Sequence, residues 1–203
     1  HPIEGHEICS TASIGLVPGT FQWECAEEVL RDADTAMYEA KRAGKSQYVV
    51  FDASMRERVQ WQLALENDLR LALDSEQLVL HYQPIVELES GRLKSLEALV
   101  RWHHPNHGLL SPPHFLPVAE ESGLIVPLGY RIIRWACQAL SKWQSERPDT
   151  APECVNINVS PSQLISDAFT SAVHSALGEN GLNPQQLHLE VTETAILSDE
   201  QAS

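Results

Sequence analysis

Residues 96–102 have the sequence LEALVRW, which carries the clearest secondary-structure pattern for the fold. Two sets of side chains alternate along it: Leu96, Ala98 and Val100 in one, and Glu97, Leu99 and Arg101 in the other. A period of two is typical of a β-strand, whose successive side chains point to opposite faces of a sheet. The stretches Val155–Ser160 and Leu187–Thr192 alternate in the same way. We therefore predict three strands that bury one face and turn a polar face the other way.

The predicted polar face carries a coherent set of side chains, namely Glu97, Arg101, Asn158 and Glu190. They stand near the carboxyl ends of their strands, which is where barrel enzymes place catalytic groups. The two carboxylates and the amide are hard oxygen donors, which suit Mg²⁺ or Mn²⁺ better than zinc. Arg101 supplies a positive charge for a phosphate. Half-exposed antiparallel strands alternate in the same way, so the alternation by itself leaves both interpretations open.

Strands and helices follow one another through most of the chain after residue 52. We expect strands at Leu78–Glu87, Leu93–Trp102, Cys154–Ser160 and Leu187–Thr192, and helices at Met55–Leu73, Pro113–Ser122, Leu128–Glu146 and Gln163–Glu179. Only the turn around Ser90-Gly91 separates the first two strands, which predicts a hairpin. The alternation beyond them predicts an α/β fold with a mainly parallel sheet.

The beginning of the chain, residues 1–52, is a smaller block. Its pattern predicts a strand at Ile8–Val17, a helix at Cys25–Ala43 that stops at Gly44, and a short strand at Gln47–Phe51. So few elements bury too little apolar surface to form a core of their own. We therefore expect this block to be the end of a domain that begins upstream, in a longer protein.

The composition limits the partners and the location of the protein. The net charge is −14, from 28 acidic and 14 basic residues. Such a chain repels nucleic acid polymers, which are bound by clustered Lys and Arg. No apolar run approaches the roughly 18 residues of a membrane-spanning helix, and no signal peptide is visible. We expect a cytoplasmic location, with any membrane anchor of the parent protein upstream.

Several short motifs occur in a characteristic order along residues 56–203. They are Tyr82-Gln83-Pro84-Ile85, Glu97-Ala98-Leu99-Val100-Arg101-Trp102, Ser111-Pro112, Phe115-Leu116-Pro117, Ala119-Glu120-Glu121-Ser122-Gly123-Leu124, Asn158-Val159-Ser160 and Glu190-Val191-Thr192-Glu193. In this order the chain resembles the EAL family of bacterial signalling domains. The resemblance implies an EAL-type (β/α)8 TIM-like barrel and a phosphodiesterase that hydrolyses cyclic di-GMP to linear pGpG in second-messenger signalling.

The same resemblance implies roles for single residues. The implied sites are metal ligands at Glu97, Asn158 and Glu190, catalytic carboxylates at Glu97 and Glu190, substrate contacts at Gln83 and Arg101, and a loop-stabilising residue at Glu193. The implied cofactor is a pair of Mg²⁺ or Mn²⁺ ions, and the implied partners are cyclic di-GMP and a second copy in a homodimer formed through EAL domains. Further family positions, an Asp-Asp pair, a Lys, a Glu and a Gln, would fall after Ser203. We therefore expect the barrel and the site to be incomplete in this chain, and the chain alone to be inactive.

The first block carries a second resemblance. Ala12-Ser13-Ile14-Gly15 and residues 33–45, ADTAMYEAKRAGK, are similar to the end of a GGDEF domain. Lys41 matches a family position that contacts nucleotide phosphates, whereas Lys45 stands where many members carry Arg. The GGDEF signature itself is absent from this chain, so the resemblance assigns no cyclase activity to it. We expect the remnant of a GGDEF domain over residues 1–52 and the amino-terminal portion of an EAL domain over residues 53–203.

Two other functions remain open. A non-catalytic EAL module would bind cyclic di-GMP or a protein partner as a signalling receptor, but the intact Glu97, Arg101, Asn158 and Glu190 favour the enzyme. A barrel glycosidase would use Glu97 and Glu190 as its carboxylate pair, and it would leave Asn158 and Arg101 without a role.

One further motif is predicted to have no functional role. Residues 103–107 have the sequence HHPNH, which looks like a metal-binding cluster. Pro105 favours an extended turn, and the EAL family uses this stretch as a loop. We therefore expect no zinc there.

Overall fold

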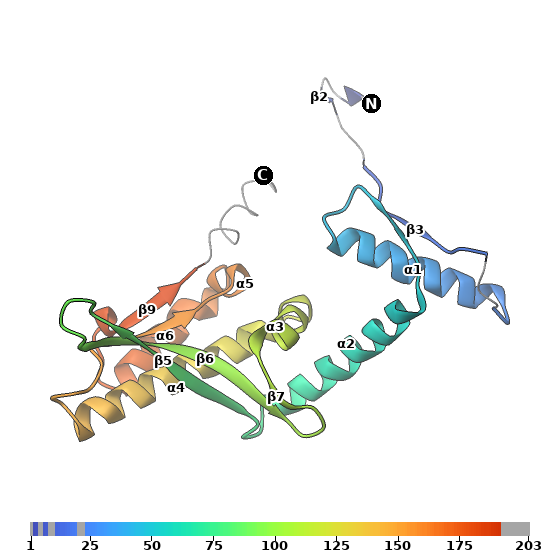
Figure 1. Cartoon of the computed structure of the whole chain (residues 1–203). Helices are drawn as coiled ribbons and strands as arrows, with labels where there is room; N and C mark the ends of the chain where they lie inside the picture. Colours follow the sequence, from blue (N-terminus) through green and yellow to red (C-terminus); the bar gives the residue numbers. More distant parts are fainter. Residues whose placement is uncertain (1, 4–5, 8–10, 20–22, 192–203) are drawn as a thin grey trace. The chain divides into compact units, whose positions relative to one another are not determined.

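The computed structural model describes residues 2–3, 6–7, 11–19 and 23–191 (Figure 1). The chain divides into two compact units, His1–Ala64 and Leu65–Ser203. The described residues form two two-stranded sheets in the first unit and a five-stranded sheet in the second, and each unit has its own cluster of buried apolar residues. Within the described residues, no helix combines the length and the apolar character that a bilayer crossing requires.

The first unit contains four short strands, one complete helix and the start of a long helix among its described residues. Its elements are β1 (Pro2–Ile3), β2 (His6–Glu7), β3 (Ile14–Leu16), α1 (Ala26–Arg42), β4 (Tyr48–Val50) and the first turns of α2 (Ala53–Ala72). β1 and β2 pair antiparallel, whereas β3 and β4 pair in parallel and are connected by α1. Gly15 allows β3 to approach α1 closely, because a Cβ at this position would overlap the carbonyl oxygen of Ala33.

The strand predicted at Ile8–Val17 is shorter than expected. Residues 8–10 lie outside the described part of the chain, and among residues 11–17 only Ile14–Leu16 form a strand. The helix and the second strand of this block are confirmed as α1 and β4, with boundaries within a residue or so of the prediction. The three residues of the observed strand, Ile14–Leu16, are the ones that pair with β4.

A buried ion pair joins α1 to the start of α2 within the first unit. The carboxylate of Asp32 is fully buried and accepts hydrogen bonds of 2.8 Å from Trp23 Nε1 and from Arg56 Nε. The Nη2 of Arg56 also donates to this carboxylate, and the guanidinium lies 5.4 Å from the centroid of the Phe51 ring. The hydrogen bonds from Arg56 hold the pKa of Asp32 below its ordinary value, so the carboxylate remains charged in the interior.

The second unit is built on a five-stranded sheet. Its strands are β5 (Leu78–Val86), β6 (Leu93–His104), β7 (Gly108–Leu110), β8 (Cys154–Asn158) and β9 (Leu187–Glu190). The order is β5-β6-β8-β9, and β7 pairs with the end of β6. β5 and β6 form the predicted antiparallel hairpin, whereas β6, β8 and β9 run parallel. The mixed α/β architecture predicted from the sequence is confirmed.

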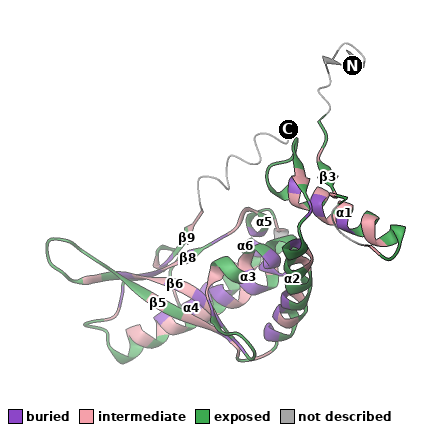
Figure 2. Ribbon diagram, turned by 45° about the vertical axis from the view of Figure 1, so that its right-hand side comes forward, coloured by how far each residue is buried: buried purple, intermediate pink, exposed green. Residues whose placement is uncertain are grey.

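Helices cover the apolar face of this sheet (Figure 2). They are the last turns of α2, α3 (Pro112–Glu121), α4 (Ile125–Glu146) and α6 (Asp167–Glu179), while the short α5 (Pro161–Leu164) and a 3₁₀ turn at Pro184–Gln186 lie in the connecting segments. Ala98 and Val100 of β6 and Val155 and Ile157 of β8 are buried in one core with these helices. These are the apolar members of the alternating pattern, so the polar members lie on the opposite, open face.

Residues 163–179 form two helices rather than the single predicted one. α5 ends at Leu164, and Ser166 has an extended conformation with a ψ of 121° as the N-cap of α6. Ser followed by Asp167 is a common helix start. The apolar periodicity on both sides concealed this signal in the sequence.

β6 extends two residues past the predicted end at Trp102, because the unexpected strand β7 pairs with it. His104 lies opposite Gly108, which has a φ of +69° at the tight turn. His104 is buried, with its Nε2 3.1 Å from Asp68 Oδ2, and its Nδ1 accepts a hydrogen bond of 3.2 Å from the backbone N–H of Asn106. The HHPNH motif is therefore the turn of a hairpin, and its buried histidine links β6 to α2.

Candidate functional site

Neighbouring strands bring Glu97 and Asn158 together on the open face of the sheet. Asn158 is the last residue of β8, and Glu97 lies on β6 opposite Asn156 in the parallel register. The Asn158 Nδ2 donates a hydrogen bond of 2.7 Å to Glu97 Oε1. A carboxylate and an amide from distant parts of the sequence thus meet near the carboxyl end of the parallel strands.

Glu190 adds a second carboxylate to this group. It is the last residue of β9 and lies opposite Asn158 in the parallel register. Adjacent strands are about 4.8 Å apart, so the two residues are direct neighbours on one face. The structure therefore gathers Glu97, Asn158 and Glu190, while their roles as metal ligands remain a prediction.

Asn156 belongs to the same group, although the sequence assigned it no role. Its Nδ2 donates a hydrogen bond of 2.6 Å to Glu190 Oε1. The sequence did show Asn156 in the alternating polar set of its strand. Only the register, which puts β8 between the two strands that carry Glu97 and Glu190, shows that this amide reaches a carboxylate.

The other predicted residues lie further from this group. Gln83 is opposite Glu97 in the β5–β6 hairpin, and its side chain is exposed. Arg101 lies further along the same face of β6, half-buried, and its Nη1 donates to the carbonyl of Val100 over 2.8 Å. No carboxylate of the described residues forms an ion pair with Arg101, so its charge is available to an anion. Glu193 lies outside the described residues.

A cavity of about 320 Å³ opens beside Asn158 and Glu190. Its walls are mainly apolar and include Leu99 of β6, Leu116 of α3 and Ile125 of α4. Small-molecule sites usually combine an apolar cavity of this size class with a few convergent polar groups. The cavity and the carboxylate–amide group together have that form.

A buried glutamine holds the turn that follows Asn158. Gln163 is 3% exposed; its Oε1 accepts a hydrogen bond of 2.7 Å from the Ser160 N–H, and its Nε2 donates one of 2.8 Å to the Ile125 carbonyl. The amide occupies space that any side chain on Gly129 would need, because a Cβ there would overlap Nε2 and lie 2.9 Å from Cδ. Gly129 in α4 therefore makes room for the contact that fixes the chain just beyond Asn158.

The thiol of Cys154 lies at the end of the polar face near the amino ends of the strands, and it is neutral. Cys154 is buried, and its Sγ lies 3.7 Å from Nδ1 of His188. Burial raises the pKa of this thiol above its usual value, so it stays protonated near neutral pH and is a poor metal ligand. Across the described residues, no three His, Cys, Asp or Glu side chains gather closely enough to hold a metal ion. A cation here would therefore need amide oxygens in addition to the two carboxylates.

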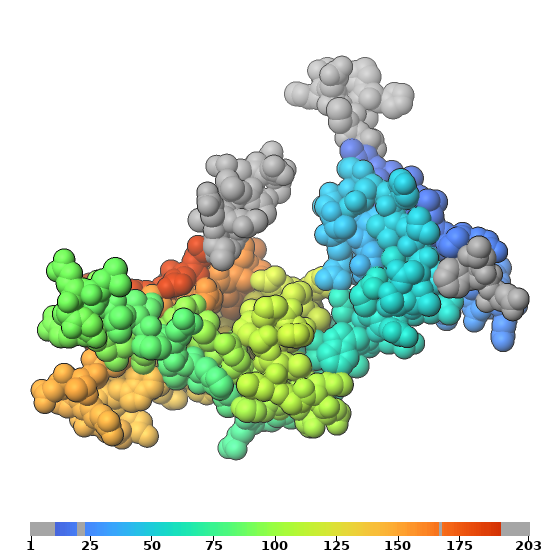
Figure 3. Space-filling model, in the orientation of Figure 1, coloured from blue at the N-terminus to red at the C-terminus, as the bar shows by residue number. Residues whose placement is uncertain are grey.

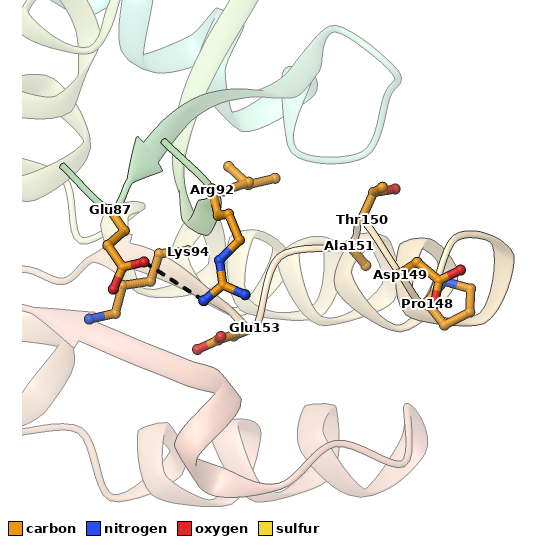
Figure 4. A pocket seen from close by; sticks show the side chains of 9 residues that line it. Glu87, Arg92, Lys94, Pro148, Asp149, Thr150, Ala151 and Glu153 are labelled. Carbon is orange, nitrogen blue, oxygen red and sulfur yellow. Dashed lines mark ion pairs between the residues drawn. The ribbon is translucent and has the colours of Figure 1, made fainter. Parts of the chain in front are cut away.

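A second cavity, of about 740 Å³, lies at the opposite end of the strands (Figure 4). Arg92 faces Glu87 there, with 3.7 Å between Nη2 and Oε2, and Lys94 and Glu153 also line the cavity. Both members of the ion pair are largely exposed, so their attraction is weak in water. The adjoining β5–β6 turn stands out at the surface (Figure 3), where Leu88 is 97% exposed. None of the residues predicted for the site lines this cavity.

Comparison with known proteins identifies the family. The model of the EAL domain family matches residues 66–203. The chain belongs to the EAL domain family. The bifunctional diguanylate cyclase/cyclic di-GMP phosphodiesterase MucR of Pseudomonas aeruginosa is 40% identical over 203 residues, which are all of this chain and 29% of MucR. The cyclic di-GMP phosphodiesterase PdeR of Escherichia coli is 36% identical over 195 residues, or 96% of this chain and 29% of PdeR. The chain thus spans less than a third of these curated relatives.

Solved structures of EAL proteins resemble this EAL domain as well. The MucR phosphodiesterase in complex with c-di-GMP has a TM-score of 0.63 at 40% identity, over 68% of this chain and 56% of that chain. The EAL enzyme Bd1971, in a form bound to cAMP and cyclic-di-GMP, has a TM-score of 0.65 at 26% identity, over 86% and 46% of the two chains. The EAL domain described above is therefore homologous to cyclic di-GMP phosphodiesterases and shares its mixed α/β fold with them.

Proposed function

We propose that the second unit binds cyclic di-GMP together with divalent cations and takes part in hydrolysing it to linear pGpG. The observation that carries the proposal is the group formed by Glu97, Asn158 and Glu190. It joins a carboxylate to an amide over 2.7 Å, with a second carboxylate on the adjacent strand. The names of MucR and PdeR as cyclic di-GMP phosphodiesterases, and the c-di-GMP complex of MucR, support this substrate.

The chemistry of this group fits a Mg²⁺ or Mn²⁺ ion. Carboxylate and amide oxygens are the ligands that such hard cations prefer. Neither Glu97 nor Glu190 forms an ion pair with a basic side chain in the described part of the chain, so amide N–H groups alone offset their charges. Asn158 turns its Nδ2 toward Glu97. A half-turn of this amide exchanges the nitrogen for the oxygen that a cation requires.

Some residues of the proposed site would bind the cations, and others would bind the substrate. Bound ions would neutralise the scissile phosphate and lower the pKa of an attacking water. Glu97 and Glu190 would act as catalytic carboxylates by holding these ions. Arg101 would pair with a phosphate oxygen through its guanidinium, and Gln83 would hydrogen-bond the substrate from the hairpin. Glu193 would stabilise a neighbouring loop of the site.

The proposal extends to the organisation of the whole chain. We assign residues 1–52 to the end of a GGDEF domain and residues 53–203 to the first part of an EAL-type TIM-like barrel. The parallel order β6-β8-β9 supports a barrel segment, and the match of MucR, also named a diguanylate cyclase, over the entire chain supports the GGDEF assignment. In the intact protein the EAL domains are proposed to form a homodimer in the cytoplasm.

Cation binding by the 203-residue chain gives the first test. Titration with Mn²⁺, followed by the electron paramagnetic resonance signal of the free ion, is expected to reveal a site. Glu97→Gln and Glu190→Gln should each weaken it by more than about tenfold, because even residues that only orient metal ligands have effects of 10- to 100-fold. Glu153→Gln is the matched control, since this exposed carboxylate lines the cavity at the other end of the strands.

Substrate binding gives the second test. Isothermal titration with cyclic di-GMP should give heat in Mg²⁺ and none in EDTA, and Arg101→Ala should weaken this binding while Mn²⁺ affinity is unchanged. Equal Mn²⁺ affinity in the wild type and in both glutamate variants contradicts the proposed cation site. Cyclic di-GMP binding that is indifferent to EDTA contradicts the role of the cation in holding the substrate.

A further inference from the structure

The side-chain amide of Asn156 has a hydrogen-bond partner for its nitrogen but none for its oxygen among the described residues. On β8 it lies between Glu97 of β6 and His188 of β9, in register with both. Its Nδ2 donates to Glu190 Oε1, whereas its Oδ1 is buried and accepts no hydrogen bond from the residues that the structure describes. Buried polar atoms without a partner are rare and unfavourable. This oxygen therefore indicates a bound group that can donate to it.

The two asparagines of β8 donate hydrogen bonds to carboxylates on two different neighbouring strands. Asn158 donates to Glu97 on one neighbouring strand, and Asn156 donates to Glu190 on the other. The two carboxylates lie on either side of β8 and repel each other. Their amide partners lie between them and present N–H groups to each, so β8 controls the orientation of both negative charges.

We propose that Asn156 is a positioning residue of the divalent-cation site. Its Nδ2 holds Glu190 in place, and its Oδ1 accepts a hydrogen bond from a water molecule in the hydration shell of the cation. Mg²⁺ keeps several of its waters when it binds to proteins, and such waters are hydrogen-bond donors. This inference rests on the cation site proposed at Glu97, Asn158 and Glu190.

Two substitutions separate the functions of the amide. Asn156→Leu has a similar volume and removes both the donor and the acceptor. Asn156→Asp keeps an oxygen at the acceptor position but replaces the N–H donor by a second oxygen beside Glu190. Two carboxylates in contact raise the pKa of one of them, so protons compete with the cation in this variant.

The test measures the affinity of the full 203-residue chain for Mn²⁺ alone, between about pH 6 and pH 8. Asn156→Leu should weaken binding by about 10- to 100-fold across this range. Asn156→Asp should bind nearly as well as the wild type at the upper end and lose affinity progressively toward the lower end. His188→Asn is the matched control, because His188 is the neighbour of Asn156 in the same row and, among the described contacts, bonds to Cys154 rather than to Glu190.

The outcomes distinguish this inference from the function on which it rests. If Glu97→Gln loses Mn²⁺ while Asn156→Leu keeps the wild-type Mn²⁺ affinity, the role of Asn156 is overturned and the proposed cation site stands. Wild-type affinity in Glu97→Gln overturns the cation site itself. If circular dichroism shows that Asn156→Leu is unfolded, Asn156→Asp decides, because a pH profile parallel to that of the wild type also overturns the inference.

Discussion

Replacing Gly129 by Ala should destabilise the second unit, although this replacement normally stabilises a helix. Gly129 lies inside α4, where Ala is favoured over Gly by about 1 kcal/mol. The added methyl group would overlap Gln163 Nε2 and lie 2.9 Å from its Cδ. Because Gln163 is almost completely buried, its amide has to leave its position to relieve the overlap.

The size of the effect follows from the two hydrogen bonds that the amide would give up. They are the 2.8 Å bond from Nε2 to the Ile125 carbonyl and the 2.7 Å bond from the Ser160 N–H to Oε1. Losing both, one in a buried and one in a partly buried position, costs about 2–4 kcal/mol. After subtracting about 1 kcal/mol for the better helix propensity of Ala, Gly129→Ala should lower the free energy of unfolding by about 1–3 kcal/mol.

Urea unfolding measures this change in the free energy of unfolding in four chains: the wild type, Gly129→Ala, Gln163→Ala and the double variant. Without the Gln163 side chain the space beside Gly129 is empty, so Gly129→Ala should then raise the free energy of unfolding by up to about 1 kcal/mol. The sign of the effect therefore reverses between the two backgrounds. Hydrogen exchange of the Ser160 amide should also be faster in Gly129→Ala. Equal effects of Gly129→Ala in both backgrounds would contradict this prediction, because they would mean that the two residues are not coupled.

Buried ionisable groups give two more measurable outcomes. Hydrogen bonding to Arg56 lowers the pKa of Asp32, so the carboxylate stabilises the first unit above its unfolded pKa of about 3.9, and this contribution disappears as the pH falls through the lower folded value. The melting temperatures of the wild type and Asp32→Asn should differ near neutral pH and converge in acid, and a constant difference would argue against the ion pair. Burial raises the pKa of Cys137 to about 11, so its thiol should resist Ellman's reagent in the native chain while the exposed Cys25 reacts; peptide mass spectrometry showing rapid native labelling of Cys137 would contradict its burial.

The strands of the second unit could be predicted because a period of two depends only on local backbone geometry. The alternation in Leu96–Trp102 separated Ala98 and Val100, which are buried in the core, from Glu97 on the open face. The register between strands is a different kind of information, because it depends on how the connecting segments pack. The alternation therefore put Asn156 in the same polar set as Asn158 without giving it a role, and only the pairing of β8 with β9 brings its amide to Glu190.

Features made by contacts between distant residues left little trace in the sequence. The short strand β7 forms because Gly108 makes a tight turn, and nothing in Gly108–Leu110 alone marks three residues as a strand. Gly129 had no recognisable function within the periodic pattern of its helix, since its importance comes from the Gln163 amide beside it. In contrast, the break before α6 did have a local signal at Ser166, which stronger periodicity concealed.

The geometry of the proposed cation site depends on β8 more than on the strands that carry the carboxylates. Both asparagines belong to β8, and Gln163 fixes the turn directly after it. A shift of β8 by one residue would turn both amides into the apolar core. Gly129→Ala, which displaces Gln163, should therefore weaken Mn²⁺ binding as well as stability. Leu140→Ala removes a fully buried side chain elsewhere in α4 and costs about 2–5 kcal/mol, yet it leaves this turn intact and should keep the Mn²⁺ affinity of the folded chain. Equal losses of affinity in the two variants would mean that the turn has no special influence on the site.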